Sequence, residues 1–218
     1  MRLNFICSLP LLSVGLLSGC GPADTVEEQT GTPSGDLAAH LQPIETWRED
    51  QVAEITPSEG TWGGWMQQVY CNPGFWAVGY RMRVEGSRGR KDDTALNSVQ
   101  LLCKSRGGAT EWISSYDGLW GNWQGAAECM GSYLSGARLR VEAPQGNGDD
   151  TGANNAEFTC SGGGYATAPG GQGWGQWSFW QSCPVNSAVC GLSIRFEGSQ
   201  GGGDDTAMNG LRLYCCSL

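Results

Sequence analysis

The sequence predicts an all-β domain in which three antiparallel sheets form the faces of a prism with a pseudo-threefold internal repeat. The first observation behind this prediction is one set of landmarks that occurs three times in the same order. The second is that the segments between landmarks alternate apolar and polar residues, which is the period of a half-buried strand. Glycine-rich turns such as 86–89 and 201–203 separate these segments. Three such sheets need one common core, and a closed prism supplies it with few open edges.

Each copy of the repeat contains the same landmarks in register. It begins with Trp-Gly-x-Trp, continues through a Cys, an Asp-Asp-Thr triplet and an Asn, and closes near a second Cys. The copies span about 61–107, 119–163 and 173–218. The landmarks are Trp62–Trp65, Trp120–Trp123 and Trp174–Trp177; Cys71, Cys129 and Cys183; Asp92-Asp93-Thr94, Asp149-Asp150-Thr151 and Asp204-Asp205-Thr206; Asn97, Asn154 and Asn209; Cys103, Cys160 and Cys215.

Two stretches of each copy are predicted to be its main strands. The first stretch ends in Val-Glu or Phe-Glu, and the second ends at the second Cys. We expect each copy to supply roughly four short strands to a sheet of its own. An Arg-x-Glu sequence near the end of the first stretch puts opposite charges on one strand face, which predicts a structural ion pair in each copy. The strands are 78–85, 134–142 and 190–197, followed by 98–103, 155–160 and 210–215; the pairs are Arg83/Glu85, Arg140/Glu142 and Arg195/Glu197.

Residues 1–19 are predicted to be a signal peptide. Arg2 precedes an apolar run from Phe5 to Leu17, which is too short for a spanning helix. The following Ser-Gly-Cys20 resembles the lipobox of bacterial lipoproteins, and that resemblance implies that Cys20 carries lipid. Gly21 then favours the outer membrane, so we expect an exported, outer membrane-anchored lipoprotein, periplasmic or at the cell surface. An ordinary secretory signal with a chance Cys is the alternative.

Acidity is a property of residues 20–60, which are predicted to be a flexible tether. The whole chain has a net charge of −9. Residues 20–59 hold nine acids and one base, giving −8, whereas residues 60–218 hold thirteen acids and eleven bases, giving −2. The only histidine, His40, lies in the tether, which removes a histidine base or a His-rich metal site from the folded domain. A domain of this charge without a basic stripe excludes nucleic acid as a partner.

The cysteines predict four disulfides in the domain 61–218. Of ten cysteines, Cys7 leaves with the signal peptide and Cys20 is assigned to lipid, which leaves eight in an exported chain. Equivalent positions in the three copies give three pairs, and the two cysteines outside the repeat pattern form the fourth. Eight cysteines allow 105 pairings, so this connectivity is an inference from the repeat. The inferred pairs are Cys71 with Cys103, Cys129 with Cys160, Cys183 with Cys215, and Cys190 with Cys216.

Several of these motifs together resemble the vitelline membrane outer layer protein I family. The resemblance rests on Trp-Gly-x-Trp, the strand ending in Val-Glu or Phe-Glu, Gly-Asp-Asp-Thr-Ala-Met-Asn at 203–209 and the terminal Cys215-Cys216, and it covers residues 61–218. It implies a β-prism of three Greek-key sheets and an extracellular, glycan-associated setting. It also implies a transfer of chitooligosaccharide units reminiscent of lysozyme.

The Asp-Asp pairs present a choice between catalysis and architecture. Paired carboxylates are what a glycosidase needs, one as acid and one as base or nucleophile. Catalysis needs such a pair once, whereas a turn that specifies the fold is needed in every copy, so we interpret these residues as structural. Triplicated calcium sites are a weaker alternative, because the spacing matches no known ligand series; we expect neither a metal nor a cofactor. The structural set is Asp92, Asp93, Asn97, Asp149, Asp150, Asn154, Asp204, Asp205 and Asn209.

The repeated tryptophans are likewise expected to fill the prism interior rather than to contact a ligand. Functional residues are better sought where the copies differ. The linker between the first two copies supplies a cluster of aromatic and acidic residues of this kind, and the third copy supplies a further aromatic residue. In addition, Arg88, Arg90 and Lys91 form a basic segment in the first copy alone, which is either a solvated loop or a site that favours an anionic partner. The candidate glycan contacts are Glu111, Trp112, Tyr116, Asp117 and Trp180.

Two functions are compatible with these observations, and no catalytic residue is assigned. The first is a non-catalytic surface module that binds extracellular glycan or contributes to a coat. The second is a lysozyme-like glycosyl transferase or hydrolase that acts on N-acetylglucosamine oligosaccharides. The lack of a unique carboxylate pair favours the first.

Overall fold

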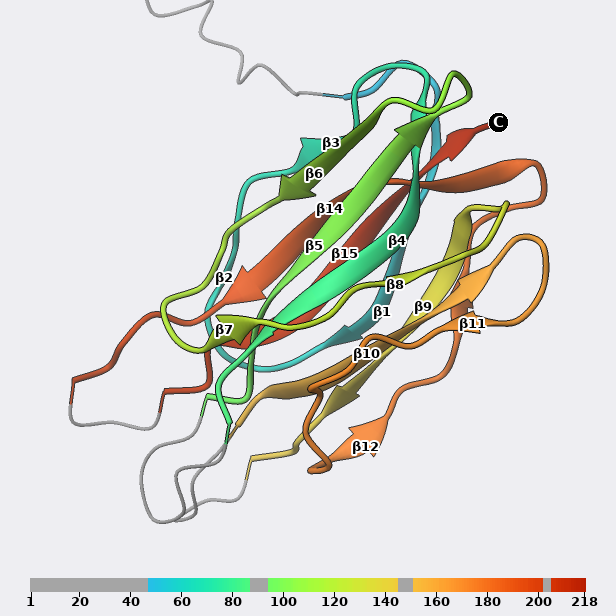
Figure 1. The fold of residues 1–218 in the computed structure, drawn as a ribbon. Helices are drawn as coiled ribbons and strands as arrows, with labels where there is room; N and C mark the ends of the chain where they lie inside the picture. The colour runs from blue at the N-terminus through green and yellow to red at the C-terminus, as the bar shows by residue number, and fades with distance from the viewer. Residues whose placement is uncertain (1–46, 87–93, 145–150, 202–204) are drawn as a thin grey trace, which may run out of the picture. The chain divides into compact units, whose positions relative to one another are not determined.

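The structure is a computed structural model that describes residues 47–86, 94–144, 151–201 and 205–218. The regular elements in these ranges are all β-strands, and they form three antiparallel sheets of five strands each (Figure 1). The all-β prism predicted from the repeat is therefore confirmed. In the part of the chain that the structure describes, no helix is long and apolar enough to cross a membrane.

Each sheet is built around one long hairpin, with shorter strands on either side of it. The first sheet contains β4 (Phe75–Val84), β5 (Leu96–Ser105), β6 (Thr110–Ser114), β7 (Asn122–Trp123) and β8 (Ala127–Glu128). The second contains β9 (Leu134–Val141), β10 (Ala153–Cys160), β11 (Tyr165–Ala166), β12 (Gln176–Trp177) and β13 (Gln181–Ser182). The third contains β14 (Ser187–Phe196), β15 (Met208–Ser217), β1 (Gln51–Glu59), β2 (Gly64–Trp65) and β3 (Val69–Tyr70).

The repeats exchange edge strands, so the expectation that each copy builds its own sheet is wrong. The Trp-Gly-x-Trp strand of the second copy, β7, pairs with β4 of the first copy, and β12 of the third copy pairs with β9 of the second. The first copy's β2 pairs with β14 of the last copy, which closes the circle (Figure 1). The physical reason is the turn glycine. A Cβ on Gly121 would lie 2.3 Å from the carbonyl carbon of Val84, so only glycine lets this turn rest on the preceding hairpin.

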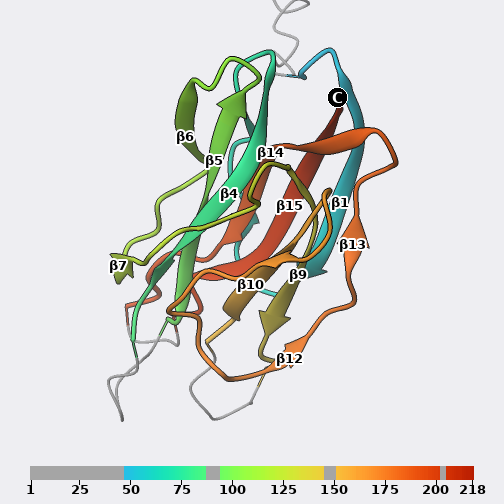
Figure 2. The same cartoon turned by 45° about the vertical axis from the view of Figure 1, so that its right-hand side comes forward.

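The folded domain begins before residue 61, which corrects the boundary of the predicted tether. Strand β1 lies within 20–60 and pairs with β15 from Gln51 to Glu59 (Figure 2). Its alternation buries Ile55, whereas Glu54 forms an ion pair with Arg212 at 2.8 Å. The acidic composition that predicted a tether therefore includes the outward face of an edge strand.

The core lies where the inner faces of the three sheets meet. It is almost entirely aliphatic and aromatic, and Tyr80 contributes a polar group to its centre. The Tyr80 hydroxyl donates to the carbonyl oxygen of Ala156 at 2.7 Å and accepts from the amide of Ala168 at 2.9 Å. Its ring lies 4.4 Å from that of Phe158. Burial raises the pKa of Tyr80 well above its usual range. One side chain thus joins the first sheet to the second.

The described residues contain four disulfides, and their connectivity is the one inferred from the repeat. Three of them join neighbouring sheets in turn around the prism, because the first Cys of each copy follows a short strand of one sheet and the second Cys lies at or near the end of a long strand of the next. The fourth links β14 to β15 within the third sheet. The bonds are Cys71–Cys103, Cys129–Cys160, Cys183–Cys215 and Cys190–Cys216.

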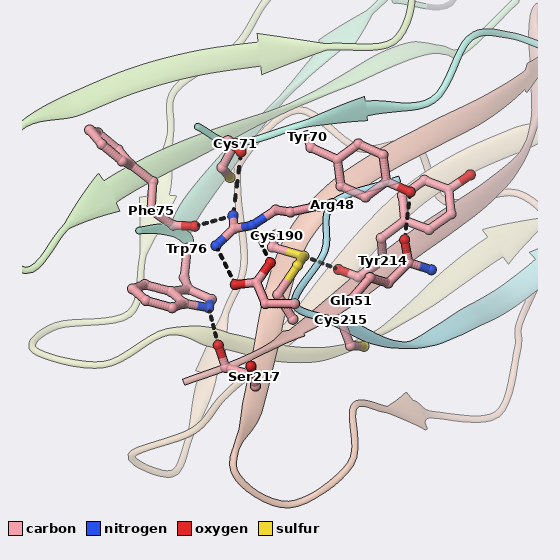
Figure 3. The surroundings of a disulfide bond; sticks show 12 residues. Arg48, Gln51, Tyr70, Cys71, Phe75, Trp76, Cys190, Tyr214, Cys215 and Ser217 are labelled. Carbon is pink, nitrogen blue, oxygen red and sulfur yellow. Dashed lines mark hydrogen bonds and ion pairs between the residues drawn. A yellow bond between two sulfur atoms is a disulfide. The ribbon is translucent and has the colours of Figure 1, made fainter. Parts of the chain in front are cut away.

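The segment before β1 is held by a buried arginine at one end of the prism. The Arg48 guanidinium points at two backbone carbonyls (Figure 3), donating to Phe75 O at 2.6 Å and Cys71 O at 3.3 Å. It also pairs with Asp50 at 2.6 Å and lies 5.5 Å from the Trp76 ring. Arg48 is only 8 % exposed, and a buried guanidinium requires such partners, so this contact fixes the start of the domain.

Candidate functional site

The Thr and Asn residues that recur at the same position in each copy form the same buried hydrogen-bond network. Thr94 donates its hydroxyl to Glu85 at 2.8 Å, and the Asn97 amide nitrogen donates to Thr94 Oγ1 at 2.7 Å. The second and third copies repeat both bonds at 2.6–2.8 Å. These polar groups satisfy one another at the start of the second long strand of each copy and are not presented to a ligand. Five of the acidic residues assigned to this motif lie outside the described residues, namely Asp92, Asp93, Asp149, Asp150 and Asp204.

Asp205 is the one acidic residue of the Asp-Asp triplets that the structure describes. Its carboxylate accepts from the amide of Gln200 at 2.6 Å and from the hydroxyl of Ser199 at 3.3 Å. These are short-range bonds within the turn between β14 and β15. This arrangement is typical of a turn-forming aspartate.

The hydrogen bonds described for the Arg-x-Glu residues differ from the expected ion pairs. Arg83 donates to the carbonyl of Gly121 at 3.1 Å, and Arg140 donates to that of Gly175 at the same distance. Arg195 likewise donates to Gly63 O at 3.1 Å. Each arginine therefore binds the Trp-Gly turn of the next copy, because edge-strand exchange brings that turn beside it.

The tryptophans of the repeated motif do not fill the interior, which corrects the packing prediction. Trp62 and Trp174 are each 40 % exposed, and none of the six belongs to the buried core. Trp120 alone packs against the core while remaining partly exposed. The reason is the alternation of side chains along a strand. Trp123 of β7 pairs with Arg83 of β4, so its side chain lies on the outer face of the sheet, beside Arg81.

An arginine between two indole rings dominates the outer face of the first sheet. The Arg81 guanidinium carbon lies 4.6 Å from the ring centroid of Trp112 on β6 and 4.9 Å from that of Trp123 on β7. Its Nε donates to the side-chain oxygen of Gln100 at 2.8 Å, and Gln100 donates to Asp117 at 3.3 Å. Trp112 is 39 % exposed. We call Arg81, Gln100, Trp112, Asp117 and Trp123 the first platform.

The second sheet carries a related arrangement on its outer face. Arg138 lies 4.4 Å from the ring centroid of Trp177 and 4.7 Å from that of Trp180. Its Nε and Nη2 donate to Glu157 at 2.8 and 2.6 Å. Trp180 stacks on Tyr165, which is 68 % exposed, with ring centroids 5.3 Å apart. We call Arg138, Glu157, Tyr165, Trp177 and Trp180 the second platform.

The third sheet has a closed version of this face. Arg212 lies 4.0 Å from the Trp65 ring, but its other neighbour is the carboxylate of Glu54 rather than a second indole. Tyr70 and Tyr214 pack together with centroids 4.9 Å apart. Burial raises the pKa of each phenol to about 12. Among the described residues, the aromatic and charged side chains of this face therefore contact one another and leave no pair of indole rings around the arginine.

The structure separates the five predicted glycan contacts. Trp112 and Asp117 lie together in the first platform, and Trp180 lies in the second. Glu111 instead accepts two hydrogen bonds from Asn72, at 2.6 Å from its amide and 2.5 Å from its side chain. Tyr116 packs edge-on against Phe196 with centroids 4.7 Å apart, as part of the core surroundings. The sequence prediction missed Arg81, Trp123, Arg138, Tyr165 and Trp177, although the alternation of each strand placed both arginines on an outer face.

Cavities near the prism ends offer a second kind of site. One of about 230 Å³ is lined by Glu59, Glu142 and Trp62, and another of about 280 Å³ by Lys104, Arg106 and Tyr133. In the first, Glu59 pairs with Arg195 at 2.5 Å and Glu142 accepts from Thr151 at 2.8 Å. The described ranges contain no cluster of side chains suited to a metal ion.

Comparison with known proteins places these features in context. The family model described as vitelline membrane outer layer protein I matches residues 52–218. The human vitelline membrane outer layer protein 1 homolog is 44 % identical over 171 residues, which cover 76 % of this chain and 82 % of that protein. The mouse homolog is 38 % identical over 187 residues, covering 83 % of this chain and 89 % of that protein.

Solved structures of jacalin-related lectins are similar in fold. A mannose-binding one from Ananas comosus gives a TM-score of 0.50 at 15 % identity, covering 76 % of this chain and 98 % of the lectin. A mannose-specific one from Morus Nigra, solved with mannose, gives 0.50 at 11 % identity, covering 80 % and 99 %. At this identity the likeness shows the shared prism fold.

Proposed function

The chain belongs to the vitelline membrane outer layer protein I family, and from this premise we propose that it is a non-catalytic surface module that binds glycans. The binding surfaces are the first and second platforms on the outer faces of the prism. The mannose-binding lectins of similar fold support the proposal, since the same framework carries sugar sites in those proteins.

One observation carries the proposal: on two faces, an arginine fixes a pair of indole rings at the surface. The contact with the guanidinium holds each indole in one orientation. The exposed part of the ring can then stack against the C–H face of a sugar. Polar side chains stand directly beside the rings, with Gln100 and Asp117 in the first platform and Glu157 in the second. Apolar ring surface combined with a few oriented polar groups is the usual composition of a small-ligand site.

Removing the rings of either platform is expected to remove glycan binding there. We expect Trp112→Ala with Trp123→Ala, and separately Trp177→Ala with Trp180→Ala, to lower affinity on a glycan array by about tenfold or more. Each aromatic contact contributes on the order of 0.5–1.5 kcal/mol beyond its buried area, and two are lost together. Trp62→Ala is the control, since Trp62 is about as exposed as Trp112 but belongs to neither platform. Full binding by a variant lacking all four rings would refute the proposal.

A lysozyme-like activity is the alternative, and the cavity lined by Glu59 and Glu142 is where it would lie. Both carboxylates are already engaged, by Arg195 and Thr151 respectively, whereas a glycosidase needs one of them as a proton donor. We therefore expect incubation with chitooligosaccharides, followed by mass spectrometry, to return the original chain lengths. New chain lengths that disappear in a Glu142→Gln variant would establish catalysis instead.

We also propose that the protein is exported and held at the outer membrane by lipid on Cys20, which lies outside the described residues. The support is the apolar run followed by Ser-Gly-Cys and the acidic segment that separates it from the domain. A Cys20→Ser variant is expected to lose incorporation of a labelled fatty acid and to leave the membrane fraction. Retention of both properties would contradict the anchor.

A further inference from the structure

The three outer faces differ at one pair of directly opposed positions. In the antiparallel register, Arg81 faces Gln100, Arg138 faces Glu157, and Ser193 faces Arg212. The first sheet therefore combines arginine with a neutral amide, where the second combines arginine with a carboxylate. In the third sheet the arginine is Arg212 on the neighbouring strand, β15, and it forms an ion pair with Glu54. A carboxylate therefore neutralises the arginine on the second and third faces, whereas a neutral amide takes its place on the first.

This difference changes which guanidinium nitrogens are used. Arg138 gives both Nε and Nη2 to Glu157. Arg81 gives its Nε to Gln100, and among the hydrogen bonds and ion pairs of the described ranges none uses its Nη1 or Nη2. The two indoles fix the plane of the Arg81 guanidinium, and the side chain is half-exposed. Its terminal edge is thus a preformed fork for an anion.

The charges around Arg81 permit an anion to approach. Asp117 is linked to it only through Gln100, at 3.3 Å from the amide nitrogen, and is solvent-exposed. Arg83, two residues along β4, donates its Nη1 to the backbone oxygen of Asp117 at 3.2 Å and so brings a second cation beside that residue. Screening by water and by this cation weakens repulsion from Asp117.

We propose that the first platform binds an anionic sugar, whose carboxylate or sulfate is received by Nη1 and Nη2 of Arg81 while its ring packs on the exposed part of Trp112. The inference rests on the proposed glycan-binding function and specifies the ligand class of one face. The second platform, with its arginine neutralised by Glu157, binds uncharged sugars.

The test is titration calorimetry with three probes: an oligogalacturonate, a sulfated galactose oligomer and an uncharged galactose oligomer. Wild-type protein is expected to bind one anionic oligomer at least tenfold more tightly than the uncharged one, and less tightly at high salt. Arg81→Gln and Gln100→Glu should each reduce that affinity by about tenfold or more. Gln100→Glu reproduces the arginine–glutamate pair of the second sheet, so it preserves the fold while occupying Arg81. Glu157→Gln should add a second anionic site.

The outcomes separate this inference from the proposed function. Unchanged anionic affinity in Gln100→Glu, or equal affinity for charged and uncharged oligomers, would overturn the inference while leaving glycan binding in place. Absence of binding to any oligomer or array glycan would overturn both. Replacing Arg88, Arg90 and Lys91 by glutamine is the control for non-specific attraction. If that variant loses the anionic ligand while Arg81→Gln keeps it, the assignment to Arg81 is wrong.

Discussion

Gly121→Ala is expected to destabilise the domain by more than about 4 kcal/mol, the range of exceptional single substitutions. Gly121 has φ of 74°, in the left-handed region that disfavours any residue with a Cβ. The added Cβ would also stand 2.3 Å from the carbonyl carbon and oxygen of Val84 and 2.4 Å from the amide nitrogen of Glu85. These are backbone atoms of a central hairpin, so relief requires the edge of the first sheet to separate. Denaturant unfolding with the disulfides intact measures the loss.

Gly131→Ala is the matched control for this substitution. Gly131 has nearly the same φ, 72°, but a Cβ there meets no atom within 4 Å. It should therefore cost only the conformational strain, about 1–2 kcal/mol. Equal losses in the two variants would show that the contact with the Val84 backbone is not what demands glycine in the Trp-Gly turn.

Asn97→Ala is expected to cost about 3 kcal/mol, because the side chain is fully buried and connects three groups. Its amide nitrogen donates to Thr94 Oγ1 at 2.7 Å and to Ala95 O at 3.3 Å, and its oxygen accepts from the backbone amide of Trp120 at 3.0 Å. The last bond crosses from one copy to the next. Removing the Asn97 side chain leaves the Trp120 N–H without its partner and leaves the Thr94 hydroxyl with its bond to Glu85 alone. An unpaired buried N–H is the costly outcome for buried polar groups. Thermal and denaturant unfolding of the purified variant give the value.

Asn154→Ala tests whether the bond between copies carries part of that cost. Asn154 makes the same two donor bonds, at 2.7 and 3.2 Å, but its buried side-chain oxygen has no hydrogen-bond partner among the described residues. We expect its replacement to cost about 1 kcal/mol less than that of Asn97. A larger loss for Asn154→Ala would contradict the assignment of the difference to Trp120.

The repeat made the prism and its disulfides predictable, but not the exchange of edge strands. Landmark spacing identifies equivalent residues, so Cys71 and Cys103 could be paired by analogy with Cys129 and Cys160. It does not indicate which sheet a two-residue strand joins. β7 is Asn122–Trp123, and so short a strand has little alternation of its own. Its partner is decided by the fit of Gly121 on Val84, a contact between residues far apart in the sequence.

The site was only partly predictable for the same reason. Trp112 falls outside the Trp-Gly-x-Trp pattern, which makes it a candidate from the sequence alone. In the sheets, however, Trp112 and Tyr165 occupy equivalent places, because Trp112 pairs with Leu102 and Tyr165 pairs with Thr159. Alternation along β4 placed Arg81 outward, but its enclosure by Trp112 and Trp123 depends on strands from different parts of the chain. Tyr116 and Glu111 are close to Trp112 in the sequence, but tertiary packing places Tyr116 against Phe196 and Glu111 against Asn72.

The central claim is that glycans bind at the outer faces and not in the cavities at the ends of the prism. The ten tryptophans make a direct test possible, because each indole N–H gives its own signal in a spectrum of ¹⁵N-labelled protein. On titration with an oligosaccharide selected from the array, we predict shifts of the signals of Trp112 and Trp123 or of Trp177 and Trp180, with Trp76 unmoved. Shifts confined to Trp62, which lines the cavity with Glu59 and Glu142, would contradict the claim.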